Sequence, residues 1–244
     1  MKNGANLRRC RIGMLLAIWS VSIFLTPVEL HASTLGKKSF KCPVDGVEFE
    51  YTIAMSGTSW GKRLDLRPTG PIVSPWPIPQ CPECGFILYK TEFTEKELQT
   101  LKAYVLSDDY RRIDRANVPY YFLASLKRMM GGDSADIGYT LLMASWQAED
   151  SRDETRMFTY LEAGLQEFIL YLAEAAKDDE TTVTVQILAG EIERRLGLFE
   201  RAKERFAGLG TSVAGSNVVV NRIIRYELEL IEATDVLPHM IPSK

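Results

Sequence analysis

The sequence contains very little histidine, the side chain that most often acts as acid or base near neutral pH. It has 2 histidines in 244 residues, and His239 follows Pro238 near the end, where we expect it to be solvated. The string G-T-S-W-G around Ser59 fits the G-x-S-x-G pattern, but that nucleophile turn needs a following helix and a downstream acid and histidine. Proline-rich sequence follows instead. The sequence therefore predicts no catalytic residue set, and a hydrolase built on Ser59 is a secondary alternative.

The chain also lacks an excess of positive charge. Its 29 lysine and arginine residues are outnumbered by 32 aspartate and glutamate residues, which gives a formal net charge of -3. Loss of residues 1–32 would remove four basic residues and one acidic residue and leave a charge of -6. Because nucleic acids and anionic membrane surfaces attract basic proteins, we expect neither as a partner. The expected partner is an unidentified protein.

The uncharged apolar run near the start is too short for an ordinary membrane span. It covers residues 12–25, whereas a spanning helix needs roughly 18 to 20 residues. Basic residues precede the run, and the small residues Ala32 and Ser33 follow it. This order predicts a secretory signal peptide over residues 1–33, cleaved after Ala32 or Ser33, and a periplasmic or extracellular protein. The alternative is membrane attachment through an uncleaved signal.

Cysteine is scarce, but its spacing is the most informative pattern in the chain. Cys10 precedes the apolar run and should leave with the signal, so three of the 4 cysteines remain. They lie in two related turns, C-P-V-D-G at residues 42–46 and C-P-E-C-G at residues 81–85. Two donors with this spacing can face one metal ion, and the glycine after them can adopt the positive φ that such a turn requires. The predicted ligands of a structural zinc ion are Cys42, Asp45, Cys81 and Cys84.

Other roles for Cys81 and Cys84 stay open at the level of the sequence. An odd number of thiols in an oxidising compartment favours a metal. A disulfide between these two cysteines, free thiols, or an intermolecular or substrate thiol role would also fit the spacing and the compartment. A thiol-disulfide oxidoreductase or redox sensor would use the same pair, and its first cysteine would begin a helix. Residues 86–89 have the pattern of a strand instead, which favours the metal.

Residues 34–93 are predicted to form a zinc-ribbon-like domain with a long insertion. Apolar and polar residues alternate over residues 47–55, which predicts a half-buried strand. The segment 46–80 between the two turns is rich in glycine and proline, and the prolines exclude a regular helix there. We expect a long packed loop whose ends a metal ion holds together.

Residues 94–233 are predicted to be helical, followed by a C-terminal tail over residues 234–244. Thr94 and Glu97 have the spacing of a capping box, in which each side chain bonds to the backbone amide of the other residue. Glycine and aspartate-rich breakers separate the later helices. These are expected over residues 109–115, 119–130, 134–149, 154–176, 181–196, 200–207 and 216–233. The predicted fold class is mainly α with a small β, zinc-ribbon-like N-terminal subdomain.

Part of the helical region matches the tetratricopeptide repeat, in which two antiparallel helices pack around small and aromatic residues. The matching positions are Gly190, Gly197, Phe199, Ala202 and Phe206. A degenerate copy near Ala144 begins 46 residues earlier, so it requires an insertion. Stacked helix pairs of this type commonly present a surface to a partner.

Charges of both signs alternate along residues 191–205. The arginines Arg194, Arg195, Arg201 and Arg205 are interleaved with glutamates, among them Glu191 and Glu193. Such a pattern is typical of a solvated, salt-bridged helix face.

The order of these parts resembles a bacterial family of uncharacterised proteins, a domain of unknown function. The resemblance covers residues 40 to about 233. It rests on the segment 196–202 and on Cys42, Pro43, Gly46, Cys81, Pro82, Cys84 and Gly85. It implies a C-P-x-C-G zinc ribbon followed by a tetratricopeptide-like domain, and it implies no reaction. The chain departs from the family pattern at Asp45, where the family would place cysteine, and in having an export signal.

The sequence as a whole predicts an exported, non-enzymatic interaction or scaffold protein. A structural zinc ion would hold its N-terminal part, and a helical-repeat surface would bind the partner. The alternative function is a thiol-disulfide oxidoreductase or redox sensor that uses Cys81 and Cys84.

Overall fold

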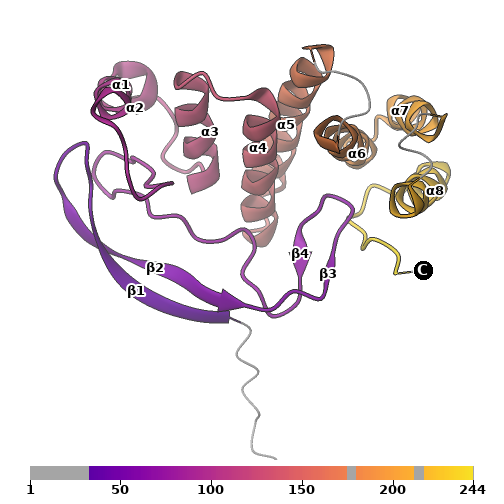
Figure 1. The fold of residues 1–244 in the computed structure, drawn as a ribbon, viewed down its shortest axis with the longest axis horizontal. Helices are drawn as coiled ribbons and strands as arrows, with labels where there is room; N and C mark the ends of the chain where they lie inside the picture. The colour runs from indigo at the N-terminus through magenta and orange to yellow at the C-terminus, as the bar shows by residue number, and fades with distance from the viewer. Residues whose placement is uncertain (1–32, 175–179, 212–216, 244) are drawn as a thin grey trace, which may run out of the picture. The chain divides into compact units, whose positions relative to one another are not determined.

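The computed structural model describes residues 33–174, 180–211 and 217–243, and these residues belong to one compact unit. The described elements are two small antiparallel sheets and eight helices (Figure 1). None of the helices in these ranges is long and apolar enough to cross a membrane. Residues 1–32 of the predicted signal peptide, including Cys10, lie outside the described residues.

The first sheet is a hairpin whose tip is the first cysteine turn. Its strands are β1 (Ser33–Lys41) and β2 (Glu48–Gly57). Near the tip, Phe40 is paired with Phe49, and their rings stack with centroids 5.9 Å apart. The strand predicted over residues 47–55 is confirmed as β2, with its apolar residues on the less exposed face. The sequence did not reveal β1, because its lysine-rich stretch has no regular alternation of apolar and polar residues.

The second sheet consists of two very short strands, β3 (Gly61–Lys62) and β4 (Pro68–Thr69). Residues 86–89 do not form the strand that their pattern predicted. Only Ile87 takes part in β pairing there, through an isolated bridge to Gln80. Phe86 and Ile87 are fully buried instead, so their apolar side chains pack against the helices.

The helical region follows the predicted order closely. The helices are α1 (Glu95–Val105), α2 (Asp108–Arg111), α3 (Pro119–Met129), α4 (Ser134–Asp150), α5 (Glu154–Glu174), α6 (Glu180–Arg195), α7 (Phe199–Thr211) and α8 (Val218–Glu232). The capping box of Thr94 and Glu97 is confirmed at the start of α1. Only α2 is clearly shorter than predicted: a helix was expected over residues 109–115, and it ends at Arg111.

Helices α3 to α8 lie side by side in chain order (Figure 1). Glycines allow two of the contacts to be close. A Cβ atom added to Gly138 of α4 would lie 2.6 Å from the ring of Phe168 in α5, and one added to Gly190 of α6 would lie 2.5 Å from Phe206 in α7. These positions therefore require glycine for packing.

The cysteine turns and the first helices share one hydrophobic cluster. Its members include Cys42, Val44, Cys81, Phe86 and Ile87 from the turns, and Leu101, Val105, Tyr110, Phe122 and Leu126 from the helices. The donor cluster therefore rests on α1, α2 and α3.

The prediction of a solvated charged face on residues 191–205 is wrong for its first half. Glu191, Glu193, Arg194 and Arg195 are all buried. Arg194 lies 2.8 Å from Glu227 of α8, so the charges pair inside the helical packing. Salt bridges were predicted within residues 191–205, but the pair with Glu227 was not, because α8 lies far along the chain.

His239 is also less exposed than expected. Its Nε2 atom lies 2.9 Å from Asp235 Oδ2, and its ring packs edge-on against Tyr226. The backbone around it is held as well, since Leu64 N donates to His239 O at 2.8 Å and Ile241 N donates to Lys62 O at 2.9 Å. The tail thus packs beside β3.

Candidate metal centre

The first cysteine turn is closed by short-range backbone hydrogen bonds. Gly46 N donates to Cys42 O at 2.9 Å, and Cys42 N donates to Val47 O at 2.9 Å. Gly46 has a φ of 79°, a conformation that side chains rarely tolerate. Asp45 lies inside this turn, where its Oδ1 accepts from Val47 N at 3.1 Å. The turn therefore fixes the backbone on both sides of the carboxylate.

The second turn repeats this backbone arrangement. Gly85 N donates to Cys81 O at 3.0 Å, Cys81 N donates to Phe86 O at 2.9 Å, and Gly85 also has a φ of 79°. Tyr110 of α2 and Arg115 of the loop between α2 and α3 lie against this turn. The Tyr110 hydroxyl donates to Gly85 O at 2.8 Å, and a Cβ atom on Gly85 would lie 2.1 Å from Arg115 Nη1. The positive φ of residue 85 therefore favours glycine, and a larger residue would also require the end of the Arg115 side chain to move.

The two turns bring all four predicted ligands together. One donor atom from each of Cys42, Asp45, Cys81 and Cys84 lies within 4.8 Å of the other three. Cys42 Sγ and Cys84 Sγ are 3.6 Å apart, and Cys81 Sγ lies 3.3 Å from Asp45 Oδ2. All three cysteines are free thiols. This cluster could hold a metal ion.

The four donors differ in their access to solvent. Cys42 and Cys81 are each 1% exposed, whereas Cys84 is half-buried and Asp45 is exposed. A hollow of about 220 Å³ reaches the cluster from the solvent side. Its lining residues are Asp45, Glu83, Cys84, Val105, Leu106, Arg111 and Arg115. Cys84 and Asp45 are therefore the donors that a dissolved molecule meets first.

Burial and hydrogen bonding shift the pKa values of three donors. Desolvation raises the pKa of Cys42 to about 11 and also raises the pKa of Cys84 well above its usual value. Desolvation would raise the pKa of Asp45 too, but hydrogen bonds from the Cys84 thiol and the Val47 amide lower it to about 2. Without a metal, Asp45 is thus ionised and accepts bonds from protonated thiols, so a bound metal must displace thiol protons.

Ser59 does not have the surroundings that a serine nucleophile needs. Its hydroxyl donates to Gly61 O at 3.1 Å, and its side chain is exposed. Strand β2 ends just before it, but the short strand β3 follows where a hydrolase would have a helix.

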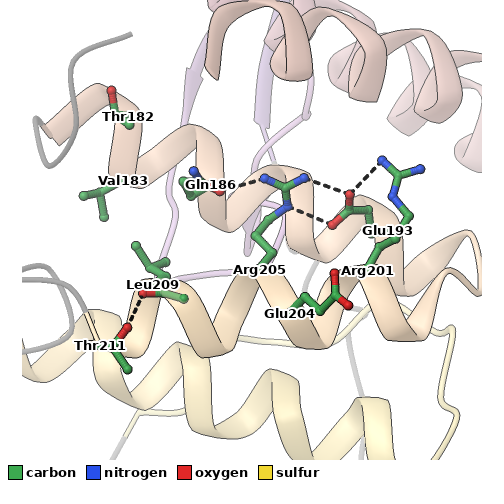
Figure 2. Close-up of a pocket in the computed structure, with 10 residues that line it drawn as sticks. Thr182, Val183, Gln186, Glu193, Arg201, Glu204, Arg205, Leu209 and Thr211 are labelled. Carbon is green, nitrogen blue, oxygen red and sulfur yellow. Dashed lines mark hydrogen bonds and ion pairs between the residues drawn. The ribbon is translucent and has the colours of Figure 1, made fainter. Parts of the chain in front are cut away.

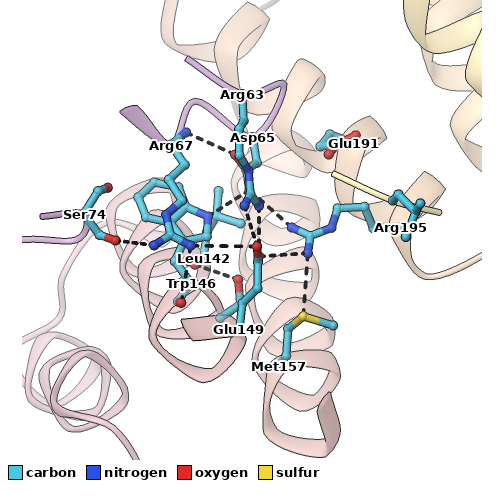
Figure 3. Close-up of polar contacts among 12 residues, drawn as sticks. Arg63, Asp65, Arg67, Ser74, Leu142, Trp146, Glu149, Met157, Glu191 and Arg195 are labelled. Carbon is cyan, nitrogen blue, oxygen red and sulfur yellow. Dashed lines mark hydrogen bonds and ion pairs between the residues drawn. The ribbon is translucent and has the colours of Figure 1, made fainter. Parts of the chain in front are cut away.

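A second polar cluster, which was not predicted, is centred on Asp65 between β3 and β4 (Figure 3). Asp65 is fully buried. Its carboxylate accepts from Arg63 at 2.5 Å, from Trp146 Nε1 at 2.9 Å and from Arg195 at 3.2 Å. Nothing in the local sequence distinguishes this aspartate, because its partners lie up to 130 residues away.

Further ion pairs extend this cluster across α4. Arg63 lies 2.6 Å from Glu149, and Arg67 lies 2.7 Å from Asp150. Arg195 of α6 also contacts Glu149, at 3.3 Å. Since every charge faces an opposite charge, the cluster links the segment between the cysteine turns to α4 and α6.

A larger hollow lies between α6 and α7 (Figure 2). Arg201 and Arg205 of α7 both point toward Glu193 of α6, at 3.1 Å and 2.8 Å. Arg205 also donates to Gln186 Oε1 at 2.7 Å. Both arginines are thus already paired with a carboxylate of the facing helix.

Together these features define a mainly helical protein with a small N-terminal hairpin and a cluster of cysteines and aspartate that could hold a metal ion. The chain belongs to the bacterial family described as "Uncharacterized protein conserved in bacteria (DUF2225)", whose model matches residues 35–230. The predicted resemblance to an uncharacterised bacterial family is thereby confirmed at the level of the family. No curated protein and no solved structure matches the chain.

Proposed function

We propose that the cysteine and aspartate cluster holds a structural zinc ion in an exported, non-enzymatic interaction protein. The observation that supports the metal most directly is the convergence of four donor atoms within 4.8 Å. They come from two turns whose residues Cys42 and Cys84 are 42 positions apart. A bound zinc ion would link these turns in the folded chain.

The donor spacing fits tetrahedral zinc. Zinc–sulfur bonds of about 2.3 Å place two sulfurs about 3.8 Å apart, and a zinc–oxygen bond of about 2.1 Å places sulfur and oxygen about 3.6 Å apart. The distance between Cys42 Sγ and Cys84 Sγ is 3.6 Å, and Cys81 Sγ lies 3.3 and 3.7 Å from the two oxygens of Asp45. Three thiolates favour zinc over the hard cations magnesium and calcium, which prefer oxygen ligands.

Metal analysis of the purified, reduced chain tests this proposal. We expect one zinc ion per chain, and loss of that zinc in a Cys81→Ser variant because a hydroxyl is a much poorer ligand than a thiolate. A Ser59→Ala variant is the control, since Ser59 is exposed and lies outside the cluster. A reduced wild-type chain that takes up no zinc from zinc-replete buffer would refute the metal centre.

A thiol-disulfide oxidoreductase is the competing function. Such an enzyme needs a cysteine with a depressed pKa at the start of a helix. Cys81 begins a turn that is followed by no helix before α1, and burial raises the pKa of Cys84. Thiol trapping followed by mass spectrometry separates the two functions, because zinc-bound cysteines should resist alkylation until a chelator is added. Rapid alkylation at one cysteine without chelator would favour the oxidoreductase.

The helical region supports the second half of the proposal, a tetratricopeptide-like surface for a protein partner. Gly190 and Phe206, a small and an aromatic residue of the repeat pattern, pack against each other between α6 and α7. A hollow of about 490 Å³ is lined by residues of α5 and of the segment that joins α6 to α7, with Ala163, Leu165 and Leu198 among them. The partly exposed Leu198 gives a partner an apolar contact on this surface.

The proposed protein-binding surface is tested by photo-crosslinking. A photoreactive residue replaces Leu198, and a matched one replaces Leu237, an exposed leucine in the tail. We expect one defined protein adduct from position 198 in intact cells and none from position 237. Adducts of equal yield at both positions, or none at either, would count against a binding surface there.

Export is tested by fractionation of cells that produce the full chain. We expect the protein outside the cytoplasm, with a new N-terminus at Ser33 or Thr34. A cytoplasmic protein that retains residues 1–32 would refute export.

A further inference from the structure

Cys84 differs from the other two cysteines of the cluster in ways that suggest a redox role for it. It is half-buried and lines the hollow that opens to solvent, whereas Cys42 and Cys81 are almost fully covered. Its sulfur lies 3.6 Å from that of Cys42, which belongs to the other turn. An oxidant can therefore reach Cys84, and the Cys42 sulfur is close enough to react with the oxidised Cys84.

We infer that the metal centre is a redox switch in which Cys84 and Cys42 form a disulfide and release the metal. This inference rests on the proposed zinc site. The predicted redox alternative placed a disulfide between Cys81 and Cys84, within one turn. The contact between Cys42 and Cys84 assigns the bond to the cross-turn pair instead.

The chemistry needs a two-electron oxidant, and a peroxide supplies it. A bound metal would displace the thiol proton and hold Cys84 as a thiolate. This thiolate attacks one peroxide oxygen, so that an S–O bond forms, the O–O bond breaks and hydroxide leaves. The Cys42 thiolate then attacks Cys84 Sγ, so that the S–S bond forms, the S–O bond breaks and a second hydroxide leaves. Two thiolates are oxidised by two electrons and one peroxide is reduced to two hydroxides, which take up protons to give water.

The surroundings of Cys84 suit the first step. Arg111 and Arg115 line the same hollow, together with the carboxylates Asp45 and Glu83. The two arginines supply cations near the negative charge that develops on the departing oxygen. The second step needs little movement, because the sulfurs must approach from 3.6 Å to about 2.05 Å.

Formation of this disulfide has two consequences for the protein. The metal loses two of its four ligands, and the remaining Cys81 and Asp45 cannot complete a tetrahedral site. The two turns nevertheless stay linked, because the covalent bond joins the same turns that the metal joined. A disulfide between Cys81 and Cys84 would lie within one turn and would leave the two turns unlinked. Oxidation of the cross-turn pair should therefore release zinc without unfolding the hairpin.

The test uses the full chain loaded with zinc and treated with hydrogen peroxide. A zinc indicator follows release, and non-reducing peptide mapping identifies the disulfide. Cleavage at lysine and arginine together with cleavage after glutamate is decisive, because Glu83 lies between Cys81 and Cys84 and separates their peptides. A chain from which zinc has been removed with a chelator is mapped in parallel.

We expect loss of most of the bound zinc together with a disulfide between the peptides of Cys42 and Cys84. A Cys84→Ser variant should form no disulfide in the cluster, whereas a Cys81→Ser variant should still form the cross-turn bond. A disulfide between Cys81 and Cys84, or zinc release without any disulfide, would overturn the redox switch. Neither result would contradict the proposal that the reduced chain binds zinc. A reduced chain that holds no zinc overturns the zinc site and with it the switch, while mapping of the metal-free chain still decides which cysteines pair.

Discussion

Asp45 is the one carboxylate among four donors, and it is also the most exposed of them. It occupies the position at which the C-P-x-C-G pattern has cysteine. Oxygen is a weaker donor to zinc than thiolate sulfur, so this residue should limit how tightly the site holds its metal.

Replacement Asp45→Cys should therefore raise zinc affinity by on the order of tenfold, equal to about 1.4 kcal/mol. Competition with a zinc chelator of known affinity measures the change. Glu83→Cys is a matched control that adds a thiol to the other turn, at a residue that lines the hollow but is not among the four donors. Equal affinity in Asp45→Cys and the wild type would show that Asp45 is not a ligand.

Glu227 is a buried residue whose charge state should affect the stability of the folded chain. Burial raises the pKa of Glu227 to about 6, although Arg194 opposes the shift. Burial also raises the pKa of Glu191, which faces the same arginine, and Asp65 adds further negative charge nearby. The Oε1 atoms of Glu191 and Glu227 are both buried without a hydrogen-bond partner. These carboxylates therefore bind protons more readily in the folded chain than in the unfolded one.

The direction of the pH effect follows from this difference. An unfolded glutamate has a pKa of about 4.3, so the stability gained from a raised pKa is fully present below about pH 4 and is lost as the pH rises through about 6. When the pH is raised from 5 to 7, the deprotonation of Glu227 alone should lower the free energy of unfolding by about 1 kcal/mol. Urea unfolding of the metal-free chain at both pH values measures this loss.

A Glu227→Gln variant should lose this part of the pH dependence, because glutamine does not titrate. Glu229→Gln on the same helix is the control, since Glu229 is exposed. If the two variants and the wild type respond identically between pH 5 and pH 7, Glu227 does not titrate in that window.

At the scale of elements, the contact between α6 and α7 depends on one glycine. A Cβ atom at Gly190 would lie 2.5 Å from the ring of Phe206, which is fully buried and has little room to move. Replacement Gly190→Ala should therefore lower the free energy of unfolding by about 1 to 3 kcal/mol, as overpacking does.

The chain offers a control for this substitution in the facing helix. A Cβ atom at Gly208 of α7 would meet no atom within 4 Å, so Gly208→Ala should raise stability by up to about 1 kcal/mol through its higher helix propensity. Denaturant unfolding of both variants measures the difference. A Gly190→Ala protein as stable as Gly208→Ala would show that the two helices are not closely packed.

At the scale of the whole molecule, buried charges join parts of the chain that are distant in sequence. Asp65 lies between the two cysteine turns, yet it pairs with Arg195 of α6 and bonds to Trp146 of α4. Burial of one charge without its partner is costly, whereas a fully paired cluster is tolerated. The ion pairs therefore fix where the 46–80 segment lies on the helices.

Replacement Asp65→Asn should lower the free energy of unfolding by about 3 kcal/mol, because it leaves Arg63 and Arg195 with less opposing charge in a buried site. Asp150→Asn is the matched control. Asp150 pairs with Arg67 of the same segment, but its side chain is 57% exposed, so its loss should cost no more than about 1 kcal/mol. Thermal and urea unfolding compare the two variants, and similar losses in both would mean that the Asp65 cluster contributes no more than a surface ion pair.

The sequence by itself determined the features that arise between near neighbours. The capping box joins Thr94 and Glu97, which are three positions apart, and the alternation in β2 is a property of one strand. Each C-P-x-x-G turn closes through bonds between residues at most five apart. Local sterics and hydrogen bonds govern such features, so their residue patterns can be recognised before any fold is known.

Only the tertiary structure decided the features that depend on distant partners. Strand β1 forms because β2 supplies its hydrogen bonds, and Phe86 and Ile87 are buried after the second turn because they pack with residues of the helices. Arg194, Arg195 and Asp65 have ordinary charged surroundings in the sequence, and they are buried because opposite charges arrive from other elements. The cluster itself combines both levels. Each turn is local, but the pairing of Cys42 with Cys84 comes from the packing that brings the two turns together.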